Sequence, residues 1–304
     1  MKKNNILFLD RQEIDVVKYD ICIGDATNSL PYASSFYLDA LCEDWSALII
    51  GDYEMVMPLP IRKKYGITYV YPPFFMQQLG IFSEKQIEAE IVHAFIKHIP
   101  QKIRFIQTNF NYANPIIEDG VQKTNLILRL DQPYEAIIKS YSKTLQRNLN
   151  KALQMTLTFE ETDKKAAFIS FYKKHTLSKT SVIKKKDIGK LSSLVDALFE
   201  KKIAKIFVVK SGSIWLSATL FLITNKRIIN LLVANSDASK ETNSSARLLD
   251  NVISLYADQK IIFDFEGSEL PGVSRFYRSF GAEEQVYFQY TENKLPALFK
   301  WLKS

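Results

Sequence analysis

Glycine, proline, cysteine and histidine are all scarce in this sequence. Ten glycines and ten prolines occur among 304 residues, and no stretch is low in complexity, which excludes collagen-like, mucin-like and largely disordered proteins. The two cysteines, Cys22 and Cys42, lie beside apolar residues, so we expect buried thiols and no disulfide. The three histidines have no CxxC, HExxH or carboxylate partner at ligand spacing, so no metal site is predicted.

A long hydrophobic run is missing near the start of the chain. Two lysines precede the four-residue apolar run ILFL, which Asp10 ends, and this run is too short for a signal peptide or a membrane span. With 47% hydrophobic residues, the chain can bury the core of two ordinary domains or of one large domain. We therefore expect a globular, cytoplasmic protein.

Positive charge is unevenly distributed along the chain. The formal net charge is +7, yet residues 1–130 hold 13 basic and 15 acidic residues, against 27 and 18 in the remainder. Residues 143–190 alone contain 12 basic and four acidic residues. Such a basic strip suits the phosphates of a coenzyme, a nucleotide sugar, a tRNA or a membrane. A solvated helix surface explains it equally well.

Hydrophobic periodicity predicts helices and strands in residues 1–130. Gly51-Asp52 is a dipeptide typical of a tight hairpin turn, and Pro58 and Pro60 predict that the strand containing them is an edge or ending strand. Ser83 and Gln86 resemble a capping box that starts a helix. The expected helices lie at residues 14–23, 32–41 and 83–98, and the expected strands at 45–50, 53–61, 103–107 and 125–130.

The remainder of the chain predicts a three-strand antiparallel meander followed by a strand-helix-strand crossover, and therefore a mixed sheet in an α/β (α+β) fold. The apolar stripe of the helix in that crossover indicates that it packs on the sheet. The expected helices lie at residues 142–154, 163–175, 187–201 and 244–257, and the expected strands at 156–160, 203–209, 214–223, 227–233 and 261–265.

This order of elements, ending in FYRSFGA at residues 276–282, resembles the GNAT acetyltransferase superfamily, whose common FYxxxG ending matches Phe276, Tyr277 and Gly281. The stretches YSKTLQRNLNKALQ (141–154) and FDFEGS are more similar to the tandem, Fem-type peptidyltransferase-like branch. The resemblance covers most of residues 130–304, and covers 1–130 only weakly, through YEMVMPLP and YPPFFMQQLG. No repeat between the two halves is visible in the sequence.

The resemblance implies two GNAT-like halves, each a mixed, largely antiparallel sheet flanked by helices. Residues 1–130 would form a degenerate half and residues 131–304 the acyltransferase half. The implied activity moves an acyl group from acyl-CoA, such as acetyl-CoA, or from aminoacyl-tRNA to the primary amine of a small molecule or peptide. Two alternatives are a catalytically silent GNAT-fold binding protein and a tRNA- or nucleic-acid-associated protein that uses the 143–190 strip.

The resemblance also implies a donor site on the strand before the long helix and at the start of that helix. A backbone N–H of the splayed strand binds the acyl carbonyl, and the helix start receives the pyrophosphate. The family's loop usually carries an Arg or Gln followed by two glycines, and this chain has no glycine between Gly212 and Gly267. That departure favours aminoacyl-tRNA as the donor, or no donor at all. At the helix start, simple N-capping by Asn243 or Ser244 is the alternative to an anion site. The expected donor-binding residues are Asn230, Leu232, Val233, Asn243, Ser244, Ser245 and Ala246.

Acid and base candidates follow in the next strand and helix. Strand alternation places Asp264 and Glu266 on one face, where two close carboxylates can raise the pKa of one of them and create a base. An ion pair of these carboxylates with Arg275, Arg278 or Lys260 is the alternative. The resemblance implies that Tyr277 protonates the leaving group, although helical spacing also fits a core position for Tyr277.

Aromatic and basic side chains are the candidates for substrate binding. A proline-bounded loop carries Tyr71, Phe75, Gln77 and Gln78, which we expect to line a groove between the halves, with buried loop packing as the alternative. Basic residues at four-residue spacing share one helix face and could clamp phosphates, although an exposed helix face explains the same spacing. These basic candidates are Lys143 and Arg147, continued by Lys151, and Arg275 in the last helix.

Overall fold

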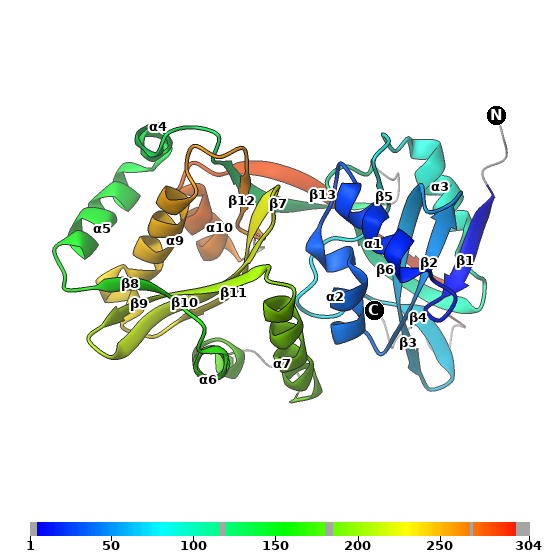
Figure 1. The fold of residues 1–304 in the computed structure, drawn as a ribbon, viewed down its shortest axis with the longest axis horizontal. Helices are drawn as coiled ribbons and strands as arrows, with labels where there is room; N and C mark the ends of the chain where they lie inside the picture. The colour runs from blue at the N-terminus through cyan, green and yellow to red at the C-terminus, as the bar shows by residue number, and fades with distance from the viewer. Residues whose placement is uncertain (1–4, 116–119, 180–184, 268–269, 296–304) are drawn as a thin grey trace. The chain divides into compact units, whose positions relative to one another are not determined.

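A computed structural model of the chain describes residues 5–115, 120–179, 185–267 and 270–295 (Figure 1). The chain divides into two compact units. Unit 1 consists of Met1–Lys123 and Val286–Ser304, and unit 2 of Thr124–Gln285. The sequence predicts two domains, residues 1–130 and 131–304, and this domain division stays a prediction. Within the described ranges, no helix is both long enough and apolar enough to cross a membrane.

Unit 1 is a mixed sheet with helices on both faces (Figure 1). Its strands run in the order β1-β2-β3-β4-β6-β13, with the short β5 beside β3. The neighbours pair antiparallel except β4 and β6, which are parallel. The elements are β1 Ile6–Asp10, α1 Val16–Asp25, η1 Pro31–Ala33, α2 Ser35–Leu41, β2 Asp44–Ile50, β3 Met55–Lys64, β4 Ile67–Val70, β5 Phe82–Ser83, α3 Ala89–His98, β6 Ile103–Phe110 and β13 Glu283–Asn293.

Alternation along β2 explains how both faces of the unit 1 sheet are covered. Leu48 belongs to the buried cluster that contains Phe95 of α3, whereas the ring of Trp45 lies 5.2 Å from that of Tyr19 in α1. Successive side chains of a strand point to opposite faces. The two sets of helices therefore bury opposite faces of one sheet.

Two expectations for unit 1 were wrong. β3 is an interior strand that pairs with β2 from Met55 to Ile61 and with β5 and β4 on its other side. Pro58 and Pro60 are tolerated because they lie between the residues that pair with β5 and those that pair with β4, where no second strand needs their missing N–H groups. Ser83 does not start a helix but ends β5, and α3 begins at Ala89.

Unit 2 is also a mixed sheet, with strand order β8-β9-β10-β11-β12-β7. β11 and β12 are parallel, and the other neighbours pair antiparallel. The elements are β7 Val121–Arg129, α4 Tyr134–Ile137, η2 Ile138–Ser140, α5 Lys143–Leu153, β8 Thr158–Thr162, α6 Lys165–His175, η3 Leu177–Lys179, α7 Lys185–Glu200, β9 Ala204–Ser211, β10 Ile214–Ile223, β11 Arg227–Asn235, α8 Ser239–Thr242, α9 Ser244–Leu255, β12 Ile262–Asp264 and α10 Pro271–Arg278. The mixed α/β fold class is confirmed.

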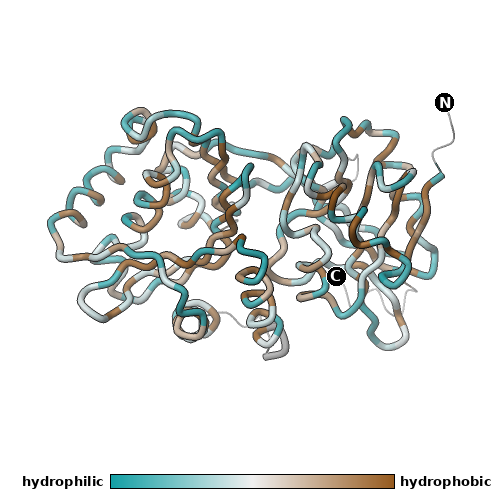
Figure 2. The backbone as a smooth tube through the Cα atoms, viewed as in Figure 1, coloured by the Kyte–Doolittle hydropathy of each residue, from teal (hydrophilic) through white to brown (hydrophobic). Residues whose placement is uncertain are grey.

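The core of unit 2 forms where the apolar stripe of α9 meets the sheet. Leu248 and Val252 of α9 are buried in one cluster with Phe207, Phe221 and Phe263 from three strands. Figure 2 shows the strands as mainly hydrophobic and the connecting loops as mainly hydrophilic. The predicted stripe of the long helix is thus the face that the sheet buries.

The two units repeat the same succession of elements. Each contains a strand, two helices, a three-strand meander, a helix, and a strand parallel to the last meander strand. β7 follows β6 in the chain but pairs with β12, whereas β13 follows α10 and pairs with β6. Each unit is therefore completed by a strand from the other half of the sequence. The internal repeat is visible in the topology although the sequence shows none.

Candidate active site

The two parallel strands of unit 2 separate partway along β11. They pair only from Arg227↔Ile262 to Ile229↔Asp264, whereas β11 continues to Asn235. On its other side, Leu220↔Leu232 is followed by Leu222↔Ile229, so two residues of β11 oppose one residue of β10. This is a β-bulge, which bends a strand and often lies beside an active site. The expected splay of this strand is present.

A cavity of about 260 Å³ lies beside the separated strands. Because it is bounded by β10, β11, α9 and α10, it lies on the α9 side of the sheet. Its lining combines apolar side chains with hydroxyl and amide groups, as expected for a small-molecule site. The lining residues are Ser217, Thr219, Val233, Asn235, Ser245, Leu248, Leu249, Val273, Phe276 and Tyr277.

The unpaired edge of β11 is fixed by α6. The hydroxyl of Thr176, which caps the C-terminus of α6, donates to the carbonyl oxygen of Val233 at 2.8 Å. In a strand, the N–H and C=O of one residue point to the same side. The N–H of Val233 therefore also points away from β10, toward the space that the separating strands leave.

A second cavity, of about 510 Å³, shares Asn235, Ser245 and Phe276 with the first. It lies at the junction of α8 and α9, and Asn148 of α5 also lines it. Ser236 lines this cavity, and its buried hydroxyl oxygen has no hydrogen-bond partner among the described residues. An orphaned buried hydroxyl is costly unless something binds it.

Basic side chains and a helix start make the second cavity suitable for an anion. Lys240 and Lys179 line it, and Lys179 is also paired with Asp237 at 3.1 Å. The first N–H groups of a helix carry partial positive charge. The start of α9, with Asn243, Ser245 and Ala246, forms part of the lining. The cavity is thus suited to an anionic group.

Asn243 takes a left-handed backbone conformation, which glycine adopts most readily. Its φ of 53° is left-handed, which asparagine tolerates better than most residues. It makes no side-chain cap hydrogen bond to α9, so the N-capping alternative does not describe Asn243. Ser244 is fully buried, and its hydroxyl bonds those of Ser217 and Ser239 at 2.8 and 2.9 Å. Ser244 therefore fixes the helix start to β10.

Asp264 is occupied by a buried ion pair. Its carboxylate lies 2.5 Å from the guanidinium of Arg227 and accepts a hydrogen bond from Asn125 and one from the backbone of Glu266. Only 1% of the Asp264 residue is exposed. The partner is Arg227 and not one of the three basic residues expected from the sequence. These contacts favour a structural role for Asp264.

Glu266 follows β12 in a left-handed conformation, with a φ of 58°. Burial raises the pKa of Tyr277 well above its ordinary value, and the charge of Glu266 raises it further. Burial also raises the pKa of Tyr172 in α6, with a smaller contribution from the same carboxylate. Both phenols therefore lie within the field of Glu266, and both stay protonated at neutral pH.

Tyr277 lines the first cavity and is almost completely buried, with 7% of the residue exposed. Its oxygen accepts a 3.3 Å hydrogen bond from the amide of Asn230. The amide oxygen of Asn230 is itself buried, and no described residue forms a hydrogen bond with it. The phenol oxygen thus accepts a hydrogen bond from Asn230, and the phenol proton can be donated to another group. Its ring also stacks on Phe265 at 4.9 Å, so the expected core packing is present as well.

The donor-site prediction included Leu232, which is buried in β11 opposite Leu220. Side chains of Leu232 and Val233 alternate across the strand. Val233 and Ser245 line the first cavity, whereas Leu232 does not. The donor-binding role of each of these residues stays a prediction.

The aromatic loop of unit 1 is fixed by hydrogen bonds inside that unit. Gln78 is buried, and its side chain bonds Gln77 and the backbone of Tyr112. The hydroxyl of Tyr37 donates to the carbonyl oxygen of Phe75, and Arg62 lies over the ring of Tyr71. These contacts favour loop packing, and a substrate role for the four candidates stays a prediction.

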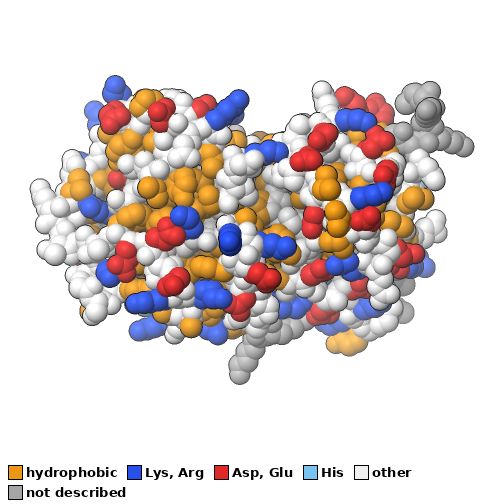
Figure 3. Space-filling model, viewed as in Figure 1, with side chains coloured by type: hydrophobic (Ala, Val, Ile, Leu, Met, Phe, Trp, Pro, Cys, Tyr) orange, Lys and Arg blue, Asp and Glu red, His pale blue; other side chains and the backbone are white. Residues whose placement is uncertain are grey.

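The basic strip does not form one surface. Lys143, Arg147 and Lys151 are exposed on α5, which Figure 1 shows beside α9, whereas α6 and α7 lie on the other side of the unit 2 sheet. In the face shown in Figure 3, basic side chains are interspersed with acidic ones. Arg275 is exposed on α10. Binding of nucleic acid by this strip stays a prediction.

Sequence reasoning missed Tyr172 and Thr176, which approach the site from α6. Helical spacing places them on one face of α6, at positions i and i+4. That spacing is a weak signal, because it predicts a buried face without saying what the face meets. In the part of the chain that the structure describes, no three His, Cys, Asp or Glu side chains are placed to hold a metal ion.

The fold is that of the GNAT-like proteins with two halves. Across 99% of this chain and 100% of the other, the structure is similar to that of FemX, with a TM-score of 0.67 and 14% identity. A tandem GNAT protein from the clavulanic acid biosynthesis pathway aligns over 96% of this chain and all of its own, with a TM-score of 0.51 and 10% identity. These similarities confirm the expected GNAT-like fold with Fem-like relatives.

A third similar structure is the C-terminal domain of a putative lysylphosphatidylglycerol synthetase from Agrobacterium fabrum. The alignment covers 95% of this chain and 94% of that domain's chain, with a TM-score of 0.55 and 9% identity. No protein-family model matches the sequence, and no curated protein matches it. Identities this low show the fold alone.

Proposed function

We propose that unit 2 transfers an acyl group from a phosphate-bearing donor, acyl-CoA or aminoacyl-tRNA, to a primary amine. The observation that carries the proposal is the separation of β11 and β12, beside which a cavity lined by Tyr277 opens. The fold shared with FemX and a tandem GNAT protein supports a transferase. The charge of Glu266 beside the same tyrosine supplies the second ionisable group.

The two adjoining cavities suit the two parts of such a donor. The phosphates would lie at the start of α9, where the buried hydroxyl of Ser236 has no partner among the described residues and Lys240 supplies positive charge. The acyl-bearing end would lie in the smaller cavity, between Val233 and Tyr277. Asn235 and Ser245 line both cavities and would contact the connecting segment.

The chemistry requires a base, an oxyanion donor and an acid. The amine nitrogen attacks the acyl carbonyl carbon and passes a proton to Glu266. The N–H of Val233 points into the open space and would donate to the oxyanion. Tyr277 then protonates the leaving sulfur or oxygen as its bond to the acyl carbon breaks. A phenol whose pKa is raised by burial remains protonated and suits the acid role.

A thermal-shift series tests donor binding. Acetyl-CoA, longer acyl-CoAs and free CoA should each raise the melting temperature, because a ligand that binds only the folded state stabilises it. A matched series with Lys240→Gln should show a smaller rise, and Lys64→Gln in unit 1 should leave it unchanged. If no CoA compound shifts the wild-type protein at millimolar concentration, the coenzyme-dependent version is wrong and aminoacyl-tRNA is the donor to assay.

Transfer assays on two variants test the roles in catalysis. Glu266→Gln and Tyr277→Phe should each lower the transfer rate about tenfold or more, the usual contribution of a general base or acid. Folding should be nearly unchanged, because both replacements keep the side-chain shape. Glu161→Gln, which breaks an exposed pair with Lys205 in the same unit, is the control. Unchanged rates in both variants would remove these residues from the mechanism and favour a silent binding protein.

A further inference from the structure

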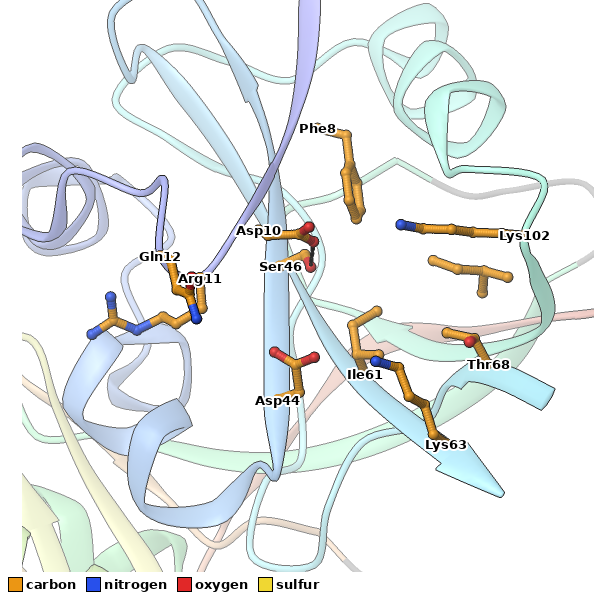
Figure 4. A pocket seen from close by; sticks show the side chains of 11 residues that line it. Phe8, Asp10, Arg11, Gln12, Asp44, Ser46, Ile61, Lys63, Thr68 and Lys102 are labelled. Atoms are coloured by element: carbon orange, nitrogen blue, oxygen red, sulfur yellow. Dashed lines mark hydrogen bonds between the residues drawn. The ribbon is translucent and has the colours of Figure 1, made fainter. Parts of the chain in front are cut away.

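A separate hollow of about 490 Å³ lies in unit 1 (Figure 4). Its lining includes Ile61 and Ile103, which also belong to the buried cluster under α3. In unit 2, the equivalent face is covered by a second helix as well, because Leu145 of α5 shares a core cluster with Leu248 of α9. In unit 1, the hollow lies over the end of this face that holds Ile61 and Ile103.

Strand register brings charged side chains to this hollow. Asp10 pairs directly with Ser46, Asp44 with Ile61, and Lys63 with Thr68. Since alternate residues of a strand share a face, the side chains of Asp44 and Ser46 lie on the face that holds Ile61 and Lys63. Lys102, immediately before β6, completes the charged set.

The two signs of charge face each other across the hollow. In Figure 4 the carboxylates of Asp10 and Asp44 lie on one side, and the ammonium groups of Lys63 and Lys102 extend toward them from the other. The floor between them is apolar, because Ile61 and Ile103 line it.

The four charged groups that face the hollow do not form ion pairs with described neighbours. The Asp10 carboxylate accepts a 2.9 Å hydrogen bond from Ser46, and the ammonium of Lys102 lies 5.5 Å from the ring centroid of Phe8. Within the described residues, none of the four charged groups forms an ion pair of 4.0 Å or less. Arg11 does not contribute, because it pairs with Asp39 and its guanidinium points away in Figure 4.

We propose that this hollow binds a small zwitterion, an α-amino acid or a dipeptide. The ligand's ammonium would face Asp10 and Asp44, its carboxylate would face Lys63 and Lys102, and its carbon skeleton would lie on the isoleucine floor. A simple anion or cation would satisfy only one side of this arrangement. The volume falls within the range of about 300–1,000 Å³ typical of small-molecule pockets. The site belongs wholly to unit 1 and is separate from the proposed transfer site.

Binding can be measured on the full chain by isothermal titration calorimetry with the standard α-amino acids and the dipeptides Gly-Gly and Ala-Leu. At least one should bind with millimolar affinity or better. For the tightest ligand, the N-acetylated form and the C-terminal amide should each bind at least about tenfold more weakly, since each lacks one charge. The variants Asp44→Asn and Lys63→Gln should each bind the zwitterion about tenfold more weakly than the wild type does.

Lys64→Gln is the matched control, because Lys64 follows Lys63 in β3 and points to the other face. It should bind the zwitterion as the wild type does. Absence of binding by every compound at millimolar concentration overturns the proposal. Equal binding of a blocked form, or unchanged binding by both pocket variants, overturns it too. None of these measurements depends on transfer activity, so the two proposals fail independently.

Discussion

The two units repeat one topology but differ where their parallel strands meet. In unit 1, β4 ends at Val70, and the chain returns so that Leu79 forms a parallel bridge with Phe110 at the end of β6. In unit 2, β11 continues past its pairing with β12, and a cavity lies beside the separated strands among the described residues. The same fold therefore gives a filled seam in one unit and a cavity in the other.

Asparagine side chains hold the filling segment of unit 1 in place. The amide nitrogens of Asn28, Asn111 and Asn114 all donate to the carbonyl oxygen of Ile81. Gly80 lies beside them with a φ of 84°, and a Cβ there would lie 2.2 Å from Asn114. The fold alone therefore does not create a site, because a short, well-bonded loop can close the opening.

The largest expected effect comes from breaking the ion pair below the opening in unit 2. Asp264→Ala would leave the buried Arg227 without its carboxylate, which typically costs about 3–5 kcal/mol of unfolding free energy. Urea denaturation followed by circular dichroism measures the loss. Glu283→Gln, which breaks the exposed pair with Arg129, should cost less than about 1 kcal/mol. Equal costs for the two variants would show that the buried pair does not hold β12 to β11.

Opening the filled seam of unit 1 should have the next largest effect. Gly80→Ala combines a left-handed backbone with a clash against Asn114 and Phe110, so we expect a loss of about 2–4 kcal/mol. Gly66→Ala is a matched control, because Gly66 has a φ of 74° and nothing within 4 Å of a new Cβ. It should cost about 1 kcal/mol. Similar melting temperatures for the two variants would contradict tight packing of the seam.

Loss of the hydrogen bond at the open edge of unit 2 should be a smaller effect. Thr176→Val keeps the shape of the side chain but removes the donor to Val233, which should cost about 1 kcal/mol. If Val233 binds the acyl carbonyl, the KM for the donor should also rise. Thr144→Val on the exposed side of α5 should change neither quantity. A wild-type KM in Thr176→Val would show that the hydrogen bond from α6 does not contribute to donor binding.

The smallest predicted effect appears at alkaline pH. Burial raises the pKa of Tyr277 in the folded chain, so its contribution to stability is fully present below the unfolded pKa of about 10 and is lost as pH rises toward the folded pKa. Between pH 7 and roughly 10.5, the free energy of unfolding of Tyr277→Phe should fall by about 1 kcal/mol less than that of the wild type. The exposed Tyr65 gives the control variant Tyr65→Phe. Identical slopes of stability against pH for wild type and Tyr277→Phe would contradict the burial of this phenol.

Much of the unit 2 fold was predictable from its residues. β10 has the expected bounds, and α5 begins after Ser142, whose side chain caps it. The pattern was clear because these strands and helices bury one continuous face. In unit 1, β1 and β4 were missed. They are short, and β4 has few buried residues, so their hydrophobic pattern is weak.

The candidate site was predictable only in part. Glu266 and Tyr277 could be selected from a strand end and a helix motif, although their roles remain predictions. The ion pair between Arg227 and Asp264 joins residues 37 positions apart in the sequence, and spacing cannot reveal such a contact. Tyr172 lies still further away along the chain, on a helix whose partner is not visible in its own periodicity.

Most of the order of elements was predictable from the residues, because local periodicity and turn residues act over a few neighbours, although β1 and β4 were missed. The shortage of glycine before α9 and the charge of each segment are also visible in the sequence. Three features are visible only in the folded protein: Asp264 is buried against Arg227, Asn243 adopts the left-handed conformation, and one seam is filled while the other is open. Those outcomes depend on contacts between distant segments, which form only when the sheets assemble.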